Sequence, residues 1–266
     1  MKYSIVIPLY NQLELLKWHI KIFNIIYTMR QDFEVIFSDD GSSDGTKEWI
    51  DDVPGIDFPY KYSWKPDIGF TIARAKNVGI QKSEGEWVIV IDGDTFLDPK
   101  ALKVLDKECT EKDVCYNAKR YPIESSELER GIKQGFLAVA LKHKDFREPM
   151  GIIPPFYFTH FSGGFFVCYG DTLRDVGYCP SSHVGYGYDD YIFAMIWMVS
   201  GFDPLTRGTK RIIKPSEAVA FHADDKPKEG SKEGRQSFQA YRDKYSNTIG
   251  VIYDTEASKG KEKLQG

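Results

Sequence analysis

The chain has few cysteines, and their spacing forms no known cysteine motif. Four cysteines occur among 266 residues (Cys109, Cys115, Cys168 and Cys179), and no two form a C-x-x-C pair. A disulfide-stabilised secreted domain or a structural zinc site would need denser or paired cysteines. The sequence therefore predicts small buried thiols in a reduced, intracellular chain.

The chain also lacks a long apolar run and an excess of either charge. The best candidate for a membrane span, 191–202, is much shorter than the roughly 20 apolar residues that a bilayer requires. The apolar start at 1–8 is too short for a signal peptide. Thirty-five Lys and Arg stand against 39 Asp and Glu, a net charge of -4, which gives no attraction to nucleic acid or an anionic membrane. We expect a cytoplasmic protein without a transmembrane segment or a nucleic-acid partner.

The sequence does contain a regular alternation of strand and helix patterns in its first half. Short apolar runs predict strands at 3–9, 33–37, 60–64 and 87–91, and helical spacing or turn signals predict helices at 13–27, 46–52 and 71–81. This alternation predicts an α/β fold, with a mainly parallel sheet flanked by helices. In such sheets, ligands bind beyond the carboxyl ends of the strands.

The second half of the chain is less regular. We expect helices at 124–146, 171–176 and 189–199, and strands at 165–169, 212–213 and 218–221. We also expect a loop or a short strand at 149–160, a mobile loop at 226–235 and a flexible tail at 258–266. The sequence has no internal repeat and no linker. It is therefore interpreted as one domain, 1–257, with halves 1–98 and 99–257.

Asp92-Gly93-Asp94 follows the last strand of the first half. Two carboxylates separated by a glycine offer hard oxygen ligands that suit Mg²⁺ or Mn²⁺ holding a diphosphate. An ordinary turn that ends a strand explains the same residues. His222 follows the apolar run 218–221 and is a candidate third ligand, although a single histidine more often has a structural role.

Asp39 ends the second predicted strand, where its carboxylate could accept a hydrogen bond from a nucleobase or ribose. A turn with Ser43 or Asp44 capping the next helix is the alternative.

Asp67 and Gly69 precede the helix that contains Lys76. The glycine permits close approach of a ligand and the lysine could face a diphosphate; a helix entry with a solvated lysine is the alternative.

Asp189 and Asp190 begin a predicted apolar helix directly after a segment rich in glycine and tyrosine, 185–188. Acids at a helix start are stabilised by the helix dipole. One of them could also be a general base, because its neighbour and burial would raise its pKa.

In combination these segments resemble the family-2 type nucleotide-sugar glycosyltransferases of the GT-A fold, in particular chondroitin-polymerase-like and β-1,4-galactosyltransferase-like catalytic domains. The matching segments occur in order over 4–235: Val6-Ile7-Pro8-Leu9-Tyr10-Asn11, Asp39-Asp40-Gly41-Ser42, Asp67-Ile68-Gly69-Phe70 with Ala75-Lys76-Asn77-Val78-Gly79, the D-x-D motif Asp92-Gly93-Asp94, Phe161-Ser162-Gly163-Gly164 with 185–190, and Phe221-His222.

The resemblance implies a role for each matching residue. The donor nucleotide sugar would contact Pro8, Tyr10, Asn11, Asp39, Asp67, Gly69, Lys76 and Asp92. The acceptor would contact Asp189, Tyr188, Tyr186, Gly163 and Gly164. Asp94, with His222 and Asp92, would hold Mn²⁺ or Mg²⁺. Asp190 would be the general base that deprotonates an acceptor hydroxyl in a single inverting displacement, with UDP as the usual leaving group.

Some positions depart from the family pattern. Lys76 replaces an arginine and loses its bidentate fork, and Tyr186, Tyr188 and Asp189 replace residues of the acceptor motif W-G-G-E-D. Because the acceptor motif faces the acceptor, these changes leave the identity of the glycan acceptor open. The donor sugar is also open, because few contacts determine it. The loop 226–235 lies where relatives carry a lid over the donor, with a solvated loop as the alternative. A catalytically inactive nucleotide-sugar or glycan-binding domain is the second hypothesis. A sugar-1-phosphate nucleotidylyltransferase is a third, opposed by the absence of a glycine-rich basic loop after the first strand.

Overall fold

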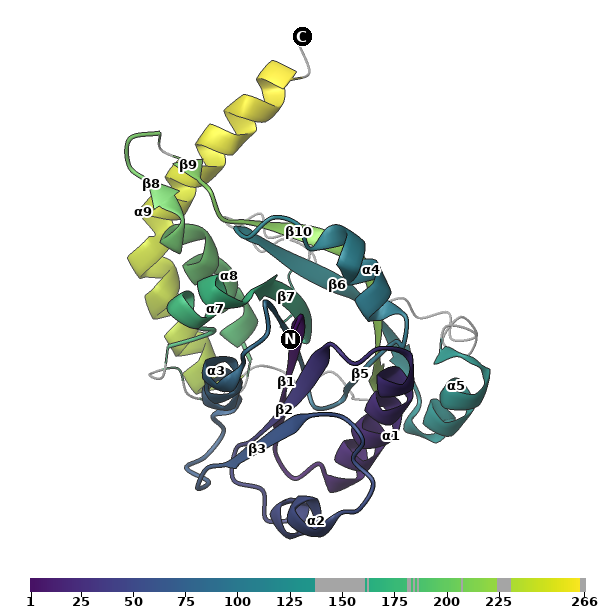
Figure 1. Cartoon of the computed structure of the whole chain (residues 1–266). Helices are drawn as coiled ribbons and strands as arrows, with labels where there is room; N and C mark the ends of the chain where they lie inside the picture. Colours follow the sequence, from purple (N-terminus) through teal and green to yellow (C-terminus); the bar gives the residue numbers. More distant parts are fainter. Residues whose placement is uncertain are drawn as a thin grey trace.

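The computed structural model describes residues 1–136, 161, 163–180, 183, 185, 187–206, 208–223 and 231–263, and of residues 119, 208, 215 and 249–263 it describes the backbone alone. Its centre is an eight-stranded sheet in the order β3-β2-β1-β4-β7-β6-β10-β5. The strands are β1 (Tyr3–Leu9), β2 (Phe33–Asp39), β3 (Tyr60–Trp64), β4 (Trp87–Ile91), β5 (Thr95–Leu97), β6 (Val114–Ile123), β7 (Phe165–Tyr169) and β10 (Ile212–Ala223). Figure 1 shows the twisted sheet with helices around it.

The sheet is mixed but mainly parallel, as predicted. Strands β1 to β4 run parallel to one another, and β10 runs parallel to β6. Strand β7 is antiparallel to β4 and to β6, and β5 is antiparallel to β10. Every residue of β1, β2 and β4 is buried, which agrees with their largely apolar sequences.

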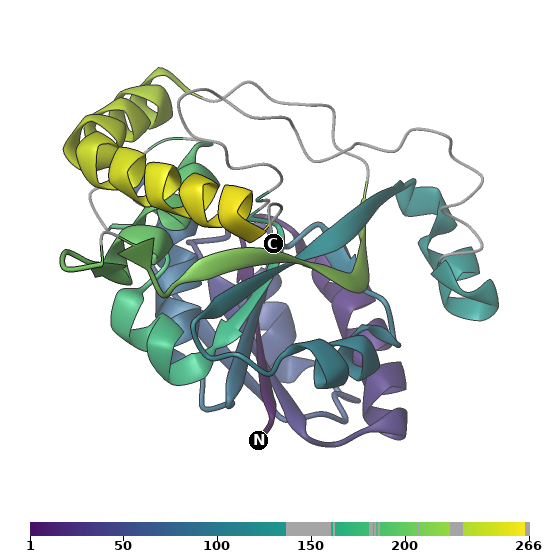
Figure 2. The same ribbon diagram turned by 90° about the horizontal axis from the view of Figure 1, so that it is seen from above.

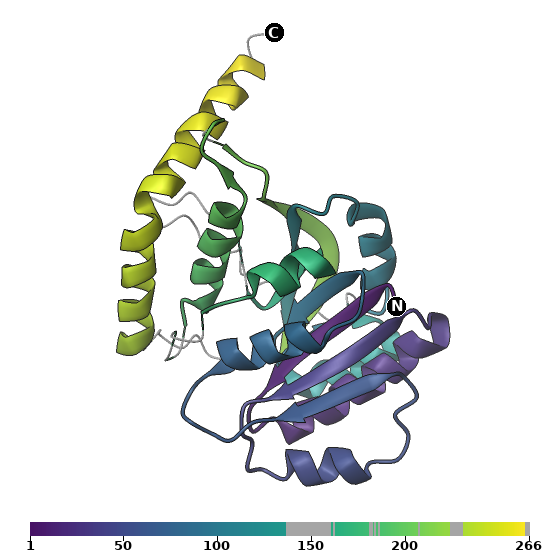
Figure 3. The ribbon, with the colours of Figure 1, turned by 60° about the vertical axis from the view of Figure 1, so that its left-hand side comes forward.

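Helices cover the two faces of the sheet with separate apolar cores. One core joins β1 to α1 (Leu13–Met29) and α4 (Ala101–Glu108), through residues such as Ile5, Phe23 and Leu105. The other joins the opposite side of β1 to α3 (Ile72–Lys82), α7 (Gly170–Val176) and α8 (Asp189–Ser200), through residues such as Val6 and Phe193. Figure 3 shows α3, α7 and α8 on the side of the sheet opposite α1.

The remaining elements lie at the periphery. They are α2 (Thr46–Asp52), a 3₁₀ turn (Ser125–Glu127) with α5 (Leu128–Gln134), the short pair β8 (Phe202–Asp203) and β9 (Gly208–Thr209), and α9 (Lys232–Lys263). Helix α9 packs against α8. Seen from above, α5 and α9 lie on opposite sides of the long strands β6 and β10 (Figure 2).

Helix α9 corrects two predictions. Residues 232–235 of the expected mobile loop form its first turn, and residues 258–263 of the expected flexible tail form its last turns. The segment is rich in Lys, Glu and Gln, which favour helix, and extending a nucleated helix is far easier than starting one. Residues 226–230 of the predicted lid lie outside the described part of the chain.

The other differences lie in the second half. The predicted strands 212–213 and 218–221 form one strand, β10, whose register shifts between Pro215 and Val219. The predicted helix 124–146 is described only to 136, where it consists of the 3₁₀ turn and α5. The predicted loop 149–160 lies outside the described residues. Strands β5 and β6 and helix α4 had not been predicted.

The four cysteines are buried and unpaired, in agreement with the prediction. Within the described residues, no helix combines the length and the apolar character needed to cross a bilayer.

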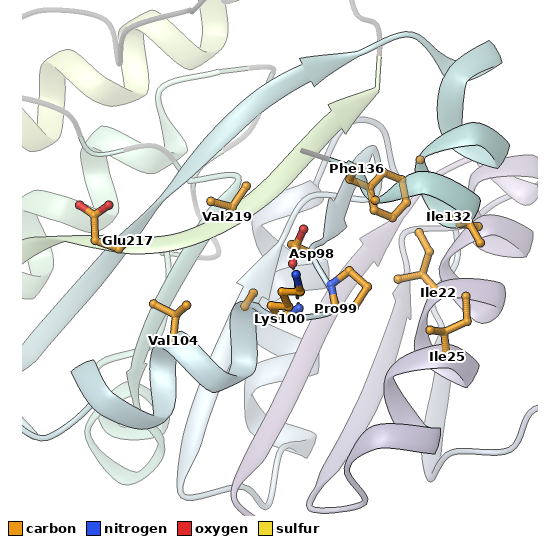
Figure 4. Close-up of a pocket in the computed structure, with 13 residues that line it drawn as sticks. Ile22, Ile25, Asp98, Pro99, Lys100, Val104, Ile132, Phe136, Glu217 and Val219 are labelled. Carbon is orange, nitrogen blue, oxygen red and sulfur yellow. Dashed lines mark hydrogen bonds between the residues drawn. The ribbon is translucent and has the colours of Figure 1, made fainter. Parts of the chain in front are cut away.

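A cavity of about 300 Å³ lies between α1, the connection from β5 to α4, α5 and β10. Its walls are mainly apolar, with Ile22, Val104, Ile132, Phe136 and Val219 among the lining side chains (Figure 4). None of the predicted site residues lines this cavity, so it is separate from the predicted active site.

Candidate active site

The carboxyl ends of β1 and β3 bring several predicted donor-binding residues together. Pro8 is buried in β1, and the half-exposed Tyr10 donates its hydroxyl hydrogen bond to Oδ2 of Asp67, at 3.0 Å. Asn11 has a positive φ of 51° and accepts a hydrogen bond from the amide of Ser43. These loops are therefore in direct contact.

Asp39, at the end of β2, is fully buried and already has three hydrogen-bond donors. Its Oδ1 accepts from the amides of Gly41 and Ser42, and its Oδ2 accepts from the hydroxyl of Tyr62 at 2.7 Å. A Cβ on Gly41, whose φ is +99°, would lie within 2.4 Å of the Asp67 amide nitrogen. The carboxylate thus holds a turn that only glycine allows to pack against the Asp67 loop.

Two further acids at this edge hold the first turns of helices. Asp44 accepts hydrogen bonds from the amide of Leu13 in α1 and from the amide of Thr46 in α2. Asp40 accepts from the amide and hydroxyl of Thr71, directly before α3. The N-cap residue of α2 is Gly45, so the prediction that Ser43 or Asp44 occupies that position was wrong, although Asp44 does bind the first helical amide.

The two acids of the Asp92-Gly93-Asp94 turn have different surroundings. Asp92 is paired with two cations, Lys76 at 2.9 Å and Arg120 at 3.7 Å. Oδ2 of Asp94 lies 3.5 Å from Nε2 of His222, in β10. The hydrogen-bonded pairing of β5 with β10, which matches Thr95 to His222, places this imidazole beside the turn.

Lys76 is almost fully buried, so it is not the solvated lysine of the alternative interpretation. Its ammonium lies 2.9 Å from Asp92 and 3.6 Å from Asp189, and it donates to the Gly163 carbonyl and the Tyr178 hydroxyl, both at 3.3 Å. Burial opposes the charge, but the carboxylates of Asp92 and Asp189 raise the pKa of Lys76 above its usual value. The lysine therefore links the donor-side turn to the predicted acceptor side.

Asp189 and Asp190 begin α8, after Tyr188, which has a left-handed backbone with φ 68°. Asp189 accepts the hydroxyl hydrogen bond of Tyr178 at 2.8 Å, in addition to its pairing with the lysine. Oδ1 of Asp190 accepts from the amide of Tyr191. Burial, and then the charge of Asp189, raise the pKa of Asp190 to about 6.

The other predicted acceptor residues lie around this pair. A Cβ on Gly163 would lie 2.8 Å from Cβ of Asp190, and one on Gly164 would overlap the Arg120 guanidinium. The ring of Tyr188 stacks on Phe238 of α9, with centroids 5.4 Å apart. Tyr186, the remaining predicted acceptor residue, lies outside the described residues. Gly69, a predicted donor residue, has a φ of +91°, and a Cβ added to it would meet no atom within 4 Å.

Sequence reasoning missed two residues of this site, Arg120 and Tyr178. Arg120 lies on β6, a strand that had not been predicted, although the apolar start of 114–118 could have revealed it. Tyr178 is fully buried and connects Lys76 with Asp189. A tyrosine after a short helix carries no recognisable signal in the sequence.

The arrangement combines a buried lysine, a partly buried carboxylate of raised pKa and an Asp–His pair. Among the described residues, no three His, Cys, Asp or Glu side chains gather closely enough to hold a metal ion alone. Asp94 and His222 nevertheless provide one oxygen and one nitrogen donor, and Mg²⁺-type sites commonly use one or two protein ligands together with substrate phosphates.

Comparison with known proteins places this geometry in context. A Streptococcus pneumoniae protein, "Glycosyltransferase GlyG", is 30% identical over 110 residues, which cover 41% of this chain and 36% of that protein. The chain spans between 17% and 37% of the length of curated relatives such as this one.

Two solved structures share the fold. S. aureus TarS in complex with UDP has a TM-score of 0.62 at 15% identity, covering 94% of this chain and 65% of that chain. The mannosyltransferase PcManGT from Pyrobaculum calidifontis, in complex with GDP-Man and Mn²⁺, has a TM-score of 0.54 at 15% identity, covering 100% of this chain and 76% of that chain. The family described as "Glycosyl transferase family 2" matches residues 4–169, which is more than half of the chain. The protein therefore belongs to glycosyl transferase family 2.

Proposed function

We propose that this chain is a metal-dependent, inverting glycosyltransferase that moves a sugar from a nucleoside-diphosphate donor, UDP-linked in our proposal, to a hydroxyl of a glycan acceptor. The observation that carries the proposal is the position of Lys76, whose ammonium contacts Asp92 of the donor-side turn and Asp189 beside the proposed base. This contact joins the donor and acceptor sides of one reaction site.

Asp190 is the proposed general base because its surroundings differ from those of Asp189. Asp189 is paired with Lys76 and accepts the hydroxyl hydrogen bond of Tyr178, whereas the pKa of Asp190 is raised to about 6. A base near the working pH is ionised and still accepts a proton readily. Asp190 accepts the proton of the acceptor O–H, the oxygen forms a bond to the anomeric carbon, and the bond to the diphosphate oxygen breaks with its electron pair on the leaving group.

The donor would occupy the carboxyl ends of β1 to β4. Pro8, Tyr10 and Asn11 would line the nucleobase pocket with Asp67 and Gly69, while Asp39 would hold the turn beneath it. Asp92 would bind the ribose. Lys76 is already saturated by protein partners, so in this proposal it fixes Asp92 rather than binding phosphate directly.

Asp94 and His222 are the proposed protein ligands of Mn²⁺ or Mg²⁺. Asp92 fits this role less well than first expected, because Lys76 and Arg120 already balance its charge. A divalent cation held by these two side chains would neutralise charge on the leaving diphosphate.

The acceptor would approach α8. Gly163 packs closely against Asp190, and Gly164 packs against Arg120 and Asp92. In this proposal both glycines, with Asp189, Tyr188 and Tyr186, would contact the acceptor sugar, and Tyr188 is oriented by its stacking on Phe238.

The first test is a thermal-shift screen of UDP, GDP and their sugar conjugates, each with and without Mn²⁺, on the purified chain. A ligand that binds only the folded state stabilises it by about 2.7 kcal/mol at a hundred times its dissociation constant. We expect a metal-dependent increase in Tm with one uridine nucleotide sugar. Absence of any shift with every nucleotide would contradict the proposal.

The second test separates a transferase from an inactive binding domain. Release of UDP from the selected donor is measured with a panel of glycan acceptors, in the wild type and in Asp190→Asn. Donor binding with equal, background UDP release in both would favour the inactive domain.

A further inference from the structure

The Asp92-Gly93-Asp94 turn is attached to the rest of the protein through all three of its carbonyl groups. The Asp92 carbonyl accepts from the amide of Thr95 at 2.9 Å, and the Asp94 carbonyl accepts from the amide of Ala223 at 2.8 Å. The carbonyl of Gly93 lies 2.9 Å from Nε2 of His19. His19 therefore provides the one contact of the three that comes from a side chain.

His19 is fully buried in α1, between the rings of Phe23 and Phe96, whose centroids lie 6.0 and 4.6 Å from its own. A carbonyl oxygen only accepts hydrogen bonds, so Nε2 must carry the proton. Nδ1 has no hydrogen-bond partner among the described residues, which agrees with a neutral ring that donates from Nε2 alone.

The turn has little room to move once this bond is made. A Cβ on Gly93 would lie within 2.7 Å of the Pro8 carbonyl and would overlap the side chain of Gln12, both at the junction of β1 and α1. The same junction begins the helix that carries His19. Gly93, between the two acids, is thus enclosed by the end of β1 and the start of α1, and His19 of α1 donates a hydrogen bond to its carbonyl.

We infer that His19 is a positioning residue for the Asp92-Gly93-Asp94 turn. By holding the turn, it sets the direction in which Asp94 presents its carboxylate to the proposed metal ion. This inference rests on the proposed function. Groups that orient a metal ligand without touching the metal typically contribute roughly 10- to 100-fold to metal affinity.

The test compares His19→Leu, which removes the donor and keeps an apolar side chain of similar volume, with His19→Gln, whose amide nitrogen can reach the same carbonyl. Mn²⁺ affinity is measured in the presence of UDP, by the electron paramagnetic resonance signal of free Mn²⁺. We expect His19→Leu to bind Mn²⁺ about 10-fold more weakly or worse, and His19→Gln to recover most of that loss. Equal affinity in the wild type and His19→Leu would overturn the inference.

A second readout does not depend on the proposed function. Amide hydrogen exchange at Thr95 and Ala223 reports how firmly the turn is held, because both amides donate to it. His19→Leu should increase exchange at these amides and leave exchange in the distant strand β3 unchanged. Unchanged exchange at both amides would refute the positioning role, whatever the nucleotide binding shows. Absence of Mn²⁺–UDP binding in the wild type would instead contradict the proposed function.

Discussion

The two ends of the parallel strands differ in how deeply they bury the cations that bridge their carboxylates. At the amino ends the bridging cations are partly exposed: Arg30 bridges Asp32 and Asp106, and Lys61 bridges Glu34 and Glu84. At the carboxyl ends, one buried ammonium, that of Lys76, is shared between Asp92 and Asp189.

This difference appears in the pKa values of the acids. The Arg30 hydrogen bond lowers the pKa of Asp32, whereas burial raises the pKa of Asp40 and Asp190 at the other end. Lowered carboxyl pKa values stabilise a protein at neutral pH, and raised ones destabilise it. Ionised Asp32 therefore contributes to stability at the amino ends, while ionised Asp40 and Asp190 lower stability at the carboxyl ends, as carboxylates of functional sites often do.

The largest expected effect comes from Asp190→Asn. Removal of a general base should lower the rate of transfer by roughly 10²- to 10⁴-fold while donor binding persists. The matched control is Asp171→Asn, which changes an exposed acid in the first turn of α7 and should leave the rate unchanged. Steady-state UDP release checks both variants, and a wild-type rate in Asp190→Asn would show that another group is the base.

The same substitution should increase stability. Because the folded pKa of Asp190 is about 6, above its unfolded value, ionisation at neutral pH destabilises the folded state. Asp190→Asn should therefore raise Tm by a few degrees at about pH 7.5, and the difference should disappear below about pH 4, where the acid is protonated in both states. Thermal unfolding at the two pH values tests this sign.

Lys76→Met should have the next largest effect. It leaves Asp92 and Asp189 without their shared cation, which for a buried pair costs about 3 kcal/mol or more, and we expect donor binding to weaken as Asp92 loses its orientation. Lys82→Met, in the exposed last turn of α3, is the control. Urea unfolding of both variants and of Lys76→Arg should rank Lys76→Met as the least stable. Equal stability of the two methionine variants would contradict the shared role of Lys76.

The pH dependence of transfer is the next test. With a base of pKa about 6, kcat/KM should rise about tenfold per pH unit below pH 6 and level off above it. Asp190→Asn should remove this inflection from the residual rate. A wild-type profile that is flat between about pH 5 and 8 would contradict the assignment.

Much of this site was predictable from sequence because its acids follow buried strands of the first half. Asp39 and Asp92 both lie at the carboxyl ends of largely apolar strands, and a parallel sheet brings such ends together. The second half was harder because β6 interrupts its apolar pattern with Lys119 and Arg120, and because helical spacing in α9 is weak. The burial of Lys76 could not be predicted from the sequence either, because it depends on Tyr178 and Asp189, about a hundred residues away along the chain.

The smallest expected effect lies at the amino ends. Asp106→Asn weakens the contacts of Asp106 with Lys2, Arg30 and the Tyr3 hydroxyl. Because Asp106 is about one-third exposed, the loss should be only about 1 kcal/mol in the free energy of unfolding. Although burial opposes it, the Lys2 and Arg30 hydrogen bonds lower the pKa of Asp106, so its contribution is present at neutral pH and is lost as the pH falls through that lowered pKa. Urea unfolding at about pH 7 and pH 3 should show the difference only at the higher pH, with kcat unchanged. A loss of kcat without a loss of stability would contradict the assignment of stability to the amino ends and of catalysis to the carboxyl ends.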